Sequence, residues 1–73
     1  MMRLWLIERG GDGYDQYFGF VVRAESEVGA RRIAAARHAD EGAAVWMDAK
    51  RSTCAELTAE GEAGVILADF SAG

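Results

Sequence analysis

Phe18–Ala39 reads FGFVVRAESEVGARRIAAARHA, and this stretch holds both a strand pattern and the strongest helix pattern of the sequence. In its first six residues, FGFVVR, every second position is aromatic or β-branched, which is typical of a β-strand. Ser26 follows as a candidate N-cap, with Glu25 and Glu27 near the positive end of the helix dipole. The sequence therefore predicts a strand that runs directly into a helix.

The predicted helix runs from Glu27 to His38, because this segment is rich in Ala and Arg, both good helix formers. Gly42 is a plausible stop after Asp40 and Glu41. At about 100° per residue, small and apolar side chains share one face, as expected for a helix lying close to a sheet. We expect the inner face to carry Gly29, Ala30, Ile33, Ala34 and Ala36, with Arg31, Arg32 and Ala35 on the opposite face.

Four further segments have the short apolar runs of β-strands. The glycine-rich run Gly10–Gly13 separates the first of them from the strand at Phe18, so these two strands should form an antiparallel hairpin. The order is then β-β-α-β-β-β, a single α+β domain over residues 1–73 with a mainly antiparallel sheet and one helix packed on one face. The four predicted strands are Met2–Glu8, Ala43–Met47, Thr53–Thr58 and Val65–Phe70.

One short helix covers only one face of such a sheet, which leaves the other face to explain. An uncovered apolar face marks a partner or self-association surface; alternatively, loops, the C-terminal strand or a strongly coiled sheet cover it. In Thr53–Thr58, we expect Thr53, Ala55 and Leu57 to face in and Cys54, Glu56 and Thr58 to face out. In the hairpin, we expect Leu4, Leu6, Phe18, Phe20 and Val22 to point at the helix and Trp5, Ile7, Tyr17 and Val21 to point away from it.

The charge is unevenly distributed along the chain. The net charge is −4, from 12 acidic and 8 basic residues. Residues 1–37 hold six Arg against five acids, whereas residues 38–73 hold seven acids against Lys50 and Arg51. This distribution argues against a phosphate-binding or nucleic-acid-binding role, which needs clustered Lys and Arg. It favours a basic protein partner, and the alternative is an acidic surface that only maintains solubility.

No reaction centre can be assembled from the sequence, so we expect a non-enzymatic protein without metal or cofactor. His38 has no nearby partner for acid–base catalysis, and Cys54 has no CxxC partner or visible base. Asp12 and Asp15 do not have the spacing of an EF-hand loop. A single cysteine and the lack of an apolar run of roughly 20 residues favour a cytoplasmic protein that does not enter a membrane.

Two stretches resemble a group of small proteins encoded by bacteriophages and prophages of high-GC bacteria. The first is LWLIERxxxxYDxYxxFVVxAESExxARRIA, from Leu4 to Ala34, and the second is GVILADFSAG, from Gly64 to Gly73. The resemblance leaves Ala35–Ala63 unconstrained and rests on residues that determine a fold. A compact, acidic chain of this origin is similar to the anti-CRISPR proteins, small phage products that disable RNA-guided nucleases, and among them it resembles inhibitors of the type I-C system.

The resemblance implies inhibition of a CRISPR effector complex, whose Lys- and Arg-lined channels guide DNA. We expect an acidic, DNA-mimicking surface to occupy such a channel, block target DNA and act as a monomer rather than a homodimer. The alternative is a small phage structural or interaction module that uses the uncovered apolar sheet face for a homodimer or assembly contact. The candidate partner-binding residues are Asp48, Glu56, Glu60, Glu62 and Asp69.

Overall fold

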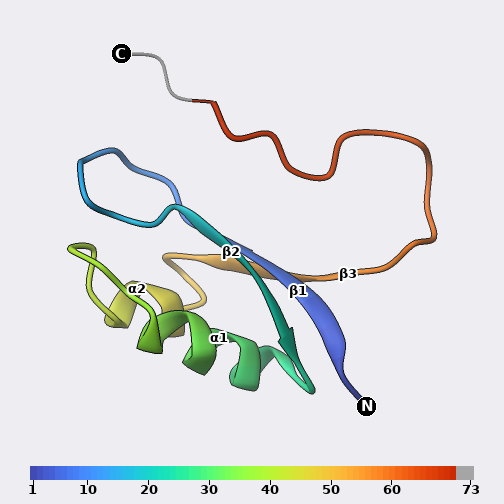
Figure 1. The fold of residues 1–73 in the computed structure, drawn as a ribbon. Helices are drawn as coiled ribbons and strands as arrows, with labels where there is room; N and C mark the ends of the chain where they lie inside the picture. Colours follow the sequence, from blue (N-terminus) through green and yellow to red (C-terminus); the bar gives the residue numbers. More distant parts are fainter. Residues whose placement is uncertain (71–73) are drawn as a thin grey trace.

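The computed structural model describes residues 1–70 and consists of one antiparallel sheet with helices on one side of it (Figure 1). The strand order is β2-β1-β3, so the first strand is central. The last three residues of the C-terminal stretch, 71–73, lie outside the described part of the chain. The elements are β1 (Arg3–Glu8), β2 (Gly19–Ala24), α1 (Glu27–Ala36), α2 (Ala44–Met47) and β3 (Thr53–Leu57).

This architecture confirms the predicted single α+β domain with its N-terminal hairpin. β1 and β2 pair antiparallel, with Trp5 opposite Val22 and Ile7 opposite Phe20. Arg9 orders the loop between them, since its Nε donates to the Tyr17 carbonyl at 2.8 Å and its guanidinium also bonds Gln16. The loop turns through positive φ at glycines, +108° at Gly11 and +134° at Gly13, a conformation that residues with a Cβ rarely adopt.

Helix α1 begins where the sequence predicts. The Ser26 hydroxyl accepts a hydrogen bond from the Gly29 amide at 3.1 Å, which satisfies one of the free donors of the first turn. The helix ends at Ala36, two residues before the predicted end at His38. Its C-cap, Arg37, donates its amide to the Ala34 carbonyl, so the chain tightens there instead of continuing.

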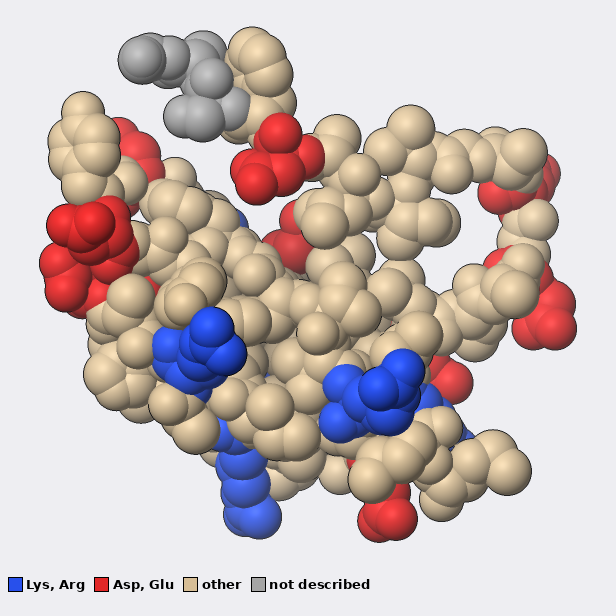
Figure 2. Space-filling model, in the orientation of Figure 1, with Lys and Arg blue, Asp and Glu red and all other residues tan. Residues whose placement is uncertain are grey.

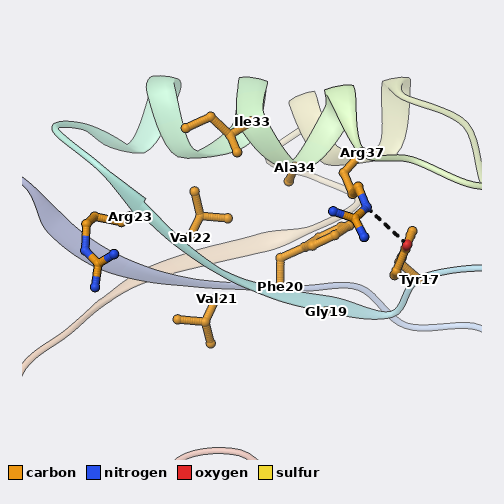
Figure 3. Close-up of a pocket in the computed structure, with 9 residues that line it drawn as sticks. All are labelled: Tyr17, Gly19, Phe20, Val21, Val22, Arg23, Ile33, Ala34 and Arg37. Atoms are coloured by element: carbon orange, nitrogen blue, oxygen red, sulfur yellow. Dashed lines mark hydrogen bonds between the residues drawn. The ribbon is translucent and has the colours of Figure 1, made fainter.

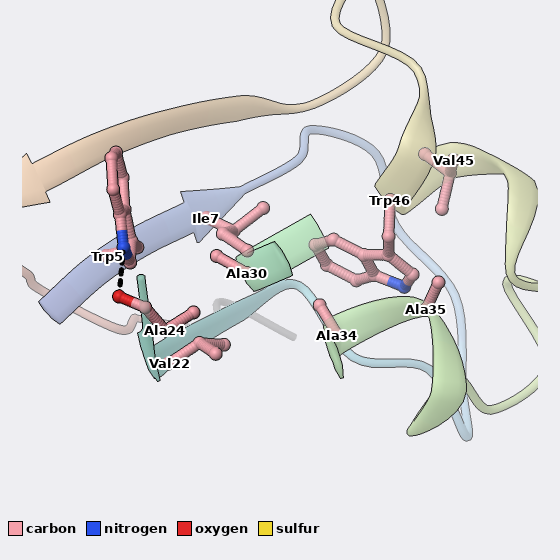
Figure 4. Close-up of a cluster of buried hydrophobic side chains, with 9 residues drawn as sticks. All are labelled: Trp5, Ile7, Val22, Ala24, Ala30, Ala34, Ala35, Val45 and Trp46. Atoms are coloured by element: carbon pink, nitrogen blue, oxygen red, sulfur yellow. Dashed lines mark hydrogen bonds between the residues drawn. The ribbon is translucent and has the colours of Figure 1, made fainter. Parts of the chain in front are cut away.

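The predicted orientation of β1 was wrong. Trp5 and Ile7 point towards the helices and belong to the core (Figure 4). Because side chains alternate along a strand, Leu4 and Leu6 lie on the face away from α1. The apolar run WLI carries large side chains on both faces, so alternation alone did not show which face is inside. The Trp5 indole also needs a buried acceptor, which the Ala24 carbonyl provides at 3.0 Å.

The predicted orientation of β3 was also wrong, because it follows from that of β1. Cys54 is half-buried and packs against the core, while Thr53 and Ala55 are exposed on the other face. Ile7 pairs with Cys54 and Leu6 with Ala55 across β1 and β3. The register therefore carries the orientation of β1 into β3.

The predicted strand at Ala43–Met47 is instead the short helix α2. In a strand, Val45 and Trp46 would point to opposite faces, but in a helical turn both contact the same core. Both are buried, and the Trp46 ring packs edge-on against Phe20 at a centroid distance of 4.8 Å. Packing of these two adjacent side chains decides the conformation.

The buried face of α1 is rotated from the predicted one. Ile33 is 51% exposed and Ala36 is also exposed, whereas Arg31 and Ala35 are buried. The helix packs against both β2 and α2, so its buried face is turned towards α2. The predicted inner residues Ala30 and Ala34 are confirmed, and Arg31 is the unexpected one.

The predicted strand at Val65–Phe70 is absent; the segment from Thr58 to Phe70 contains no helix or strand. After β3 the chain runs on the side of the sheet away from α1 (Figure 1). Apolar composition there was not sufficient, because a strand also requires a hydrogen-bonding partner. Within residues 1–70, no helix is long and apolar enough to cross a membrane.

Candidate functional site

The structure distributes the five candidate partner-binding acids over different parts of the molecule. Glu56 lies on β3 and pairs with Arg3 at 3.5 Å. Asp48 follows α2, and its Oδ1 accepts a hydrogen bond from the Lys50 amide at 2.8 Å. Both carboxylates therefore already have partners within the fold.

The other three acids, Glu60, Glu62 and Asp69, are exposed on the C-terminal segment. Among the described residues none of the three forms an ion pair. Figure 2 shows acidic side chains in separate groups, several of them along this segment, with Lys and Arg side chains on the body below. The segment Thr58–Phe70, here called the acidic segment, thus contains three acids and no basic residue.

The acidic segment also exposes large apolar side chains. Phe70 is 87% exposed, and Val65, Ile66 and Leu67 are exposed as well. Residues 67–70 line a cleft of about 380 Å³ together with the start of β2. The segment combines exposed apolar side chains with flanking carboxylates, and exposed apolar surface rimmed by polar residues marks interaction sites.

The uncovered sheet face carries fewer large side chains than the sequence indicated. Leu4 and Val21 are exposed there, and Leu6 between them is almost fully buried. Trp5 and Ile7, expected on this face, belong to the core instead. Tyr17 is half-buried and packs against the core, so of the four expected residues only Val21 lies on the uncovered face.

A buried arginine of α1 joins that helix to α2 and to Ser52, the residue before β3. Arg31 is 5% exposed, and its Nη1 donates to the Trp46 carbonyl at 3.0 Å and to the Ser52 hydroxyl at 2.7 Å. Its Nη2 donates to the Ser52 carbonyl at 2.9 Å, and its Nε pairs with Glu27 at 2.9 Å. A guanidinium with its donors satisfied in this way holds the chain after α2 in place and is not free for chemistry.

Glu41, which follows α1 in the chain, also holds separate segments together. Its carboxylate accepts hydrogen bonds from the Trp46 indole at 2.8 Å and from the amides of Ala39 and Tyr17 at 3.1 Å. Desolvation raises the pKa of Glu41, but the hydrogen bonds together outweigh it and lower the pKa to about 2. The carboxylate therefore ties the hairpin loop to the chain between the two helices.

Sequence reasoning missed both of these residues. The spacing of Glu27 and Arg31, four apart on a helix, was a signal for the ion pair. It could not show that the pair is partly buried. Nothing in the sequence around Glu41 indicated that its carboxylate would collect donors from three separate segments.

The remaining candidates for chemistry do not come together. His38 is exposed, and one ring nitrogen lies 2.9 Å from the Ala39 carbonyl. Desolvation, followed by the charge of Glu27, raises the pKa of the Cys54 thiol, while Arg31 opposes the shift. A raised pKa disfavours the nucleophilic thiolate. Residues 1–70 hold no group of three or more His, Cys, Asp or Glu side chains placed to bind a metal ion.

Comparisons of the chain with known protein families, characterised proteins and solved structures find no match.

Proposed function

We propose that this protein is a non-catalytic inhibitor of the anti-CRISPR kind, acting in the bacterial host cell. It binds a basic surface of a CRISPR effector complex, of type I-C, and blocks target DNA binding. The observation that carries the proposal is the acidic segment, whose carboxylates at Glu60, Glu62 and Asp69 are exposed and have no cationic partner within the described residues. The resemblance to small phage proteins supplies the class of target.

The physical basis is electrostatic competition with DNA. Effector complexes hold nucleic acid in channels lined by Lys and Arg, and the spaced carboxylates of a small protein compete for the same cations. Opposite charge also speeds the encounter at low ionic strength. Asp48 and Glu56 contribute less to this surface than the other three acids, because each already has a partner within the fold.

The test reverses charge within the acidic segment. A triple variant with Glu60→Lys, Glu62→Lys and Asp69→Lys should lose co-purification with a type I-C effector complex and inhibition of its DNA binding, while its circular dichroism spectrum stays unchanged. The matched control carries three reversals elsewhere on the surface, Asp12→Lys, Glu25→Lys and Asp40→Lys, and should keep most of its binding.

Full inhibition by the folded triple variant would refute the proposal. An equal loss of binding in the triple variant and in the control would mean that binding depends on net charge and not on the acidic segment. Binding should also weaken steeply as ionic strength rises, because the contacts are between exposed charges.

A second candidate function is a phage interaction or assembly module that docks through apolar contacts. It is favoured by the exposed Val65, Ile66 and Phe70 of the acidic segment and by Val21 on the uncovered sheet face. Apolar docking hardly responds to salt, so the same salt titration separates the two candidates.

A further inference from the structure

Strand β2 is an edge of the sheet and leaves one row of backbone N–H and C=O groups without a strand partner. Helix α1 runs beside this edge, and the two enclose a groove of about 510 Å³ (Figure 3). The groove is lined by Phe20 and Val22 of β2 and by Ile33 and Ala34 of α1. An open strand edge beside a helix is the geometry in which extended peptides bind by adding a strand.

The charge of this groove is opposite to that of the whole protein. Arg37 lines it on the α1 side and Arg23 on the other side of β2, and no acidic residue is among its lining residues (Figure 3). Arg37 donates to the Tyr17 hydroxyl at 3.3 Å. Neither arginine forms an ion pair within residues 1–70. The groove therefore suits an extended segment with apolar side chains and a carboxylate.

The chain itself contains such a segment. Val65–Phe70, VILADF, has the apolar composition of a strand and one acid, yet it pairs with no strand and its large side chains are exposed. Within its own copy it runs on the sheet side away from α1, where residues 67–70 line the cleft of about 380 Å³ with the start of β2, and none of its residues lines the groove beside α1. The groove therefore stays open to the same segment of another copy.

We propose that Val65–Phe70 of a second copy adds to the free edge of β2 as an antiparallel strand. Val65–Phe70 and β2 are both six residues long. One pairing register places compatible side chains opposite each other on both faces of the sheet. With Asp69 opposite Phe20, Leu67 lies opposite Val22 and contacts Ile33 across the groove, because side chains alternate along a strand.

The same register brings Asp69 to an arginine of the groove and Phe70 to the glycine at the start of β2. Asp69 reaches Arg37, which lies at the Phe20 end of the groove beside Tyr17 (Figure 3). Phe70 lies opposite Gly19 and covers a strand position that has no side chain, a pairing that stabilises edge glycines. A two-fold arrangement lets each copy give one segment and receive one, so the interface closes as a dimer. The proposed dimer differs from the monomer expected from the sequence. It engages Asp69, so Glu60 and Glu62 are the carboxylates of the acidic segment that stay free for a basic partner.

A charge-swap experiment tests the pairing. Arg37→Glu and Asp69→Lys should each reduce dimer formation at least roughly tenfold in sedimentation experiments at micromolar concentration. An equimolar mixture of the two variants should dimerise again, because Asp69 of one copy meets Arg37 of the other and the new lysine meets the new glutamate. Wild-type protein that sediments as a monomer throughout the micromolar range, or a mixture that stays dissociated, overturns the proposal.

Disulfide trapping tests the register and the exchange between copies. In a Cys54→Ser background, one tagged copy carries Ile33→Cys and an untagged copy carries Leu67→Cys; oxidation should give a cross-linked heterodimer. Val28→Cys replaces Ile33→Cys as the control, since Val28 is equally exposed on α1 but does not line the groove. Equal cross-linking in the control overturns the register. A chain carrying both Ile33→Cys and Leu67→Cys that links only within itself overturns the exchange.

Discussion

Replacing Arg31 should remove a large part of the stability of this fold. Arg31 is buried and donates to the Trp46 carbonyl, the Ser52 hydroxyl and the Ser52 carbonyl, in addition to its pair with Glu27. In Arg31→Ala, the two carbonyls lose their charged donor in a site that water reaches poorly. Each unpaired buried acceptor costs about 1–3 kcal/mol, and breaking a buried ionic contact costs about 3–5 kcal/mol in total. We expect a loss of about 3–5 kcal/mol.

This loss is large for a chain of 73 residues, whose free energy of unfolding is expected to be roughly 4–11 kcal/mol. Arg31→Lys should recover only part of it, because an ammonium cannot reproduce the fork of donors that reaches both Trp46 and Ser52. Arg32→Ala is the matched control, since Arg32 is exposed and lies next to it on the same helix. That change should stay within about 0.5 kcal/mol.

The assay is urea unfolding followed by tryptophan fluorescence, which reports the burial of Trp46 and Trp5. The quantity compared is the free energy of unfolding extrapolated to water, with the slope checked for constancy between variants. If the free energy of unfolding of Arg31→Ala lies within about 1 kcal/mol of the wild-type value at the same slope, the guanidinium does not hold the two helices and the chain before β3 together. That result would refute the structural role assigned to Arg31.

Two further predictions test the fold. The pKa of Glu41 is lowered to about 2 in the folded protein, so the ionised carboxylate adds to the free energy of unfolding. This stabilisation is complete above the unfolded pKa of the group and is lost as pH falls from about 5 towards 2. Because the carboxylate is partly exposed to solvent, the stabilisation is only about 1–2 kcal/mol. Urea midpoints measured across this range should fall more steeply for wild type than for Glu41→Gln, and parallel curves would contradict the role of this carboxylate. Ile7→Ala should cost about 2–4 kcal/mol by calorimetry, because Ile7 is fully buried among the helices and strands. Val21→Ala, on the uncovered face, should cost less than about 1 kcal/mol. If Val21→Ala cost more than Ile7→Ala, the orientation of the hairpin expected from the sequence would be the correct one.

Local patterns in the sequence were sufficient for β1, β2, the start of α1 at Ser26 and the position of β3. Each depends on interactions within a few residues: alternation along a strand, glycines in the hairpin loop and a hydroxyl that caps the first helical turn. They also placed the acids in the second half of the chain, on which the proposed function depends. For these features, neighbouring residues carry enough information.

Tertiary packing decided the rest, because periodicity relates side chains within an element but does not say which face is inside. β1 is apolar on both faces and α1 is rich in alanine, so only contact with α2 and β2 selected Ile7 and Arg31 as buried. The same packing made AAVWM a helix, because a helical turn places Val45 and Trp46 in one core where a strand would separate them. The groove beside Arg37 likewise exists only because α1 lies along the free edge of β2, an arrangement of segments that no local pattern contains.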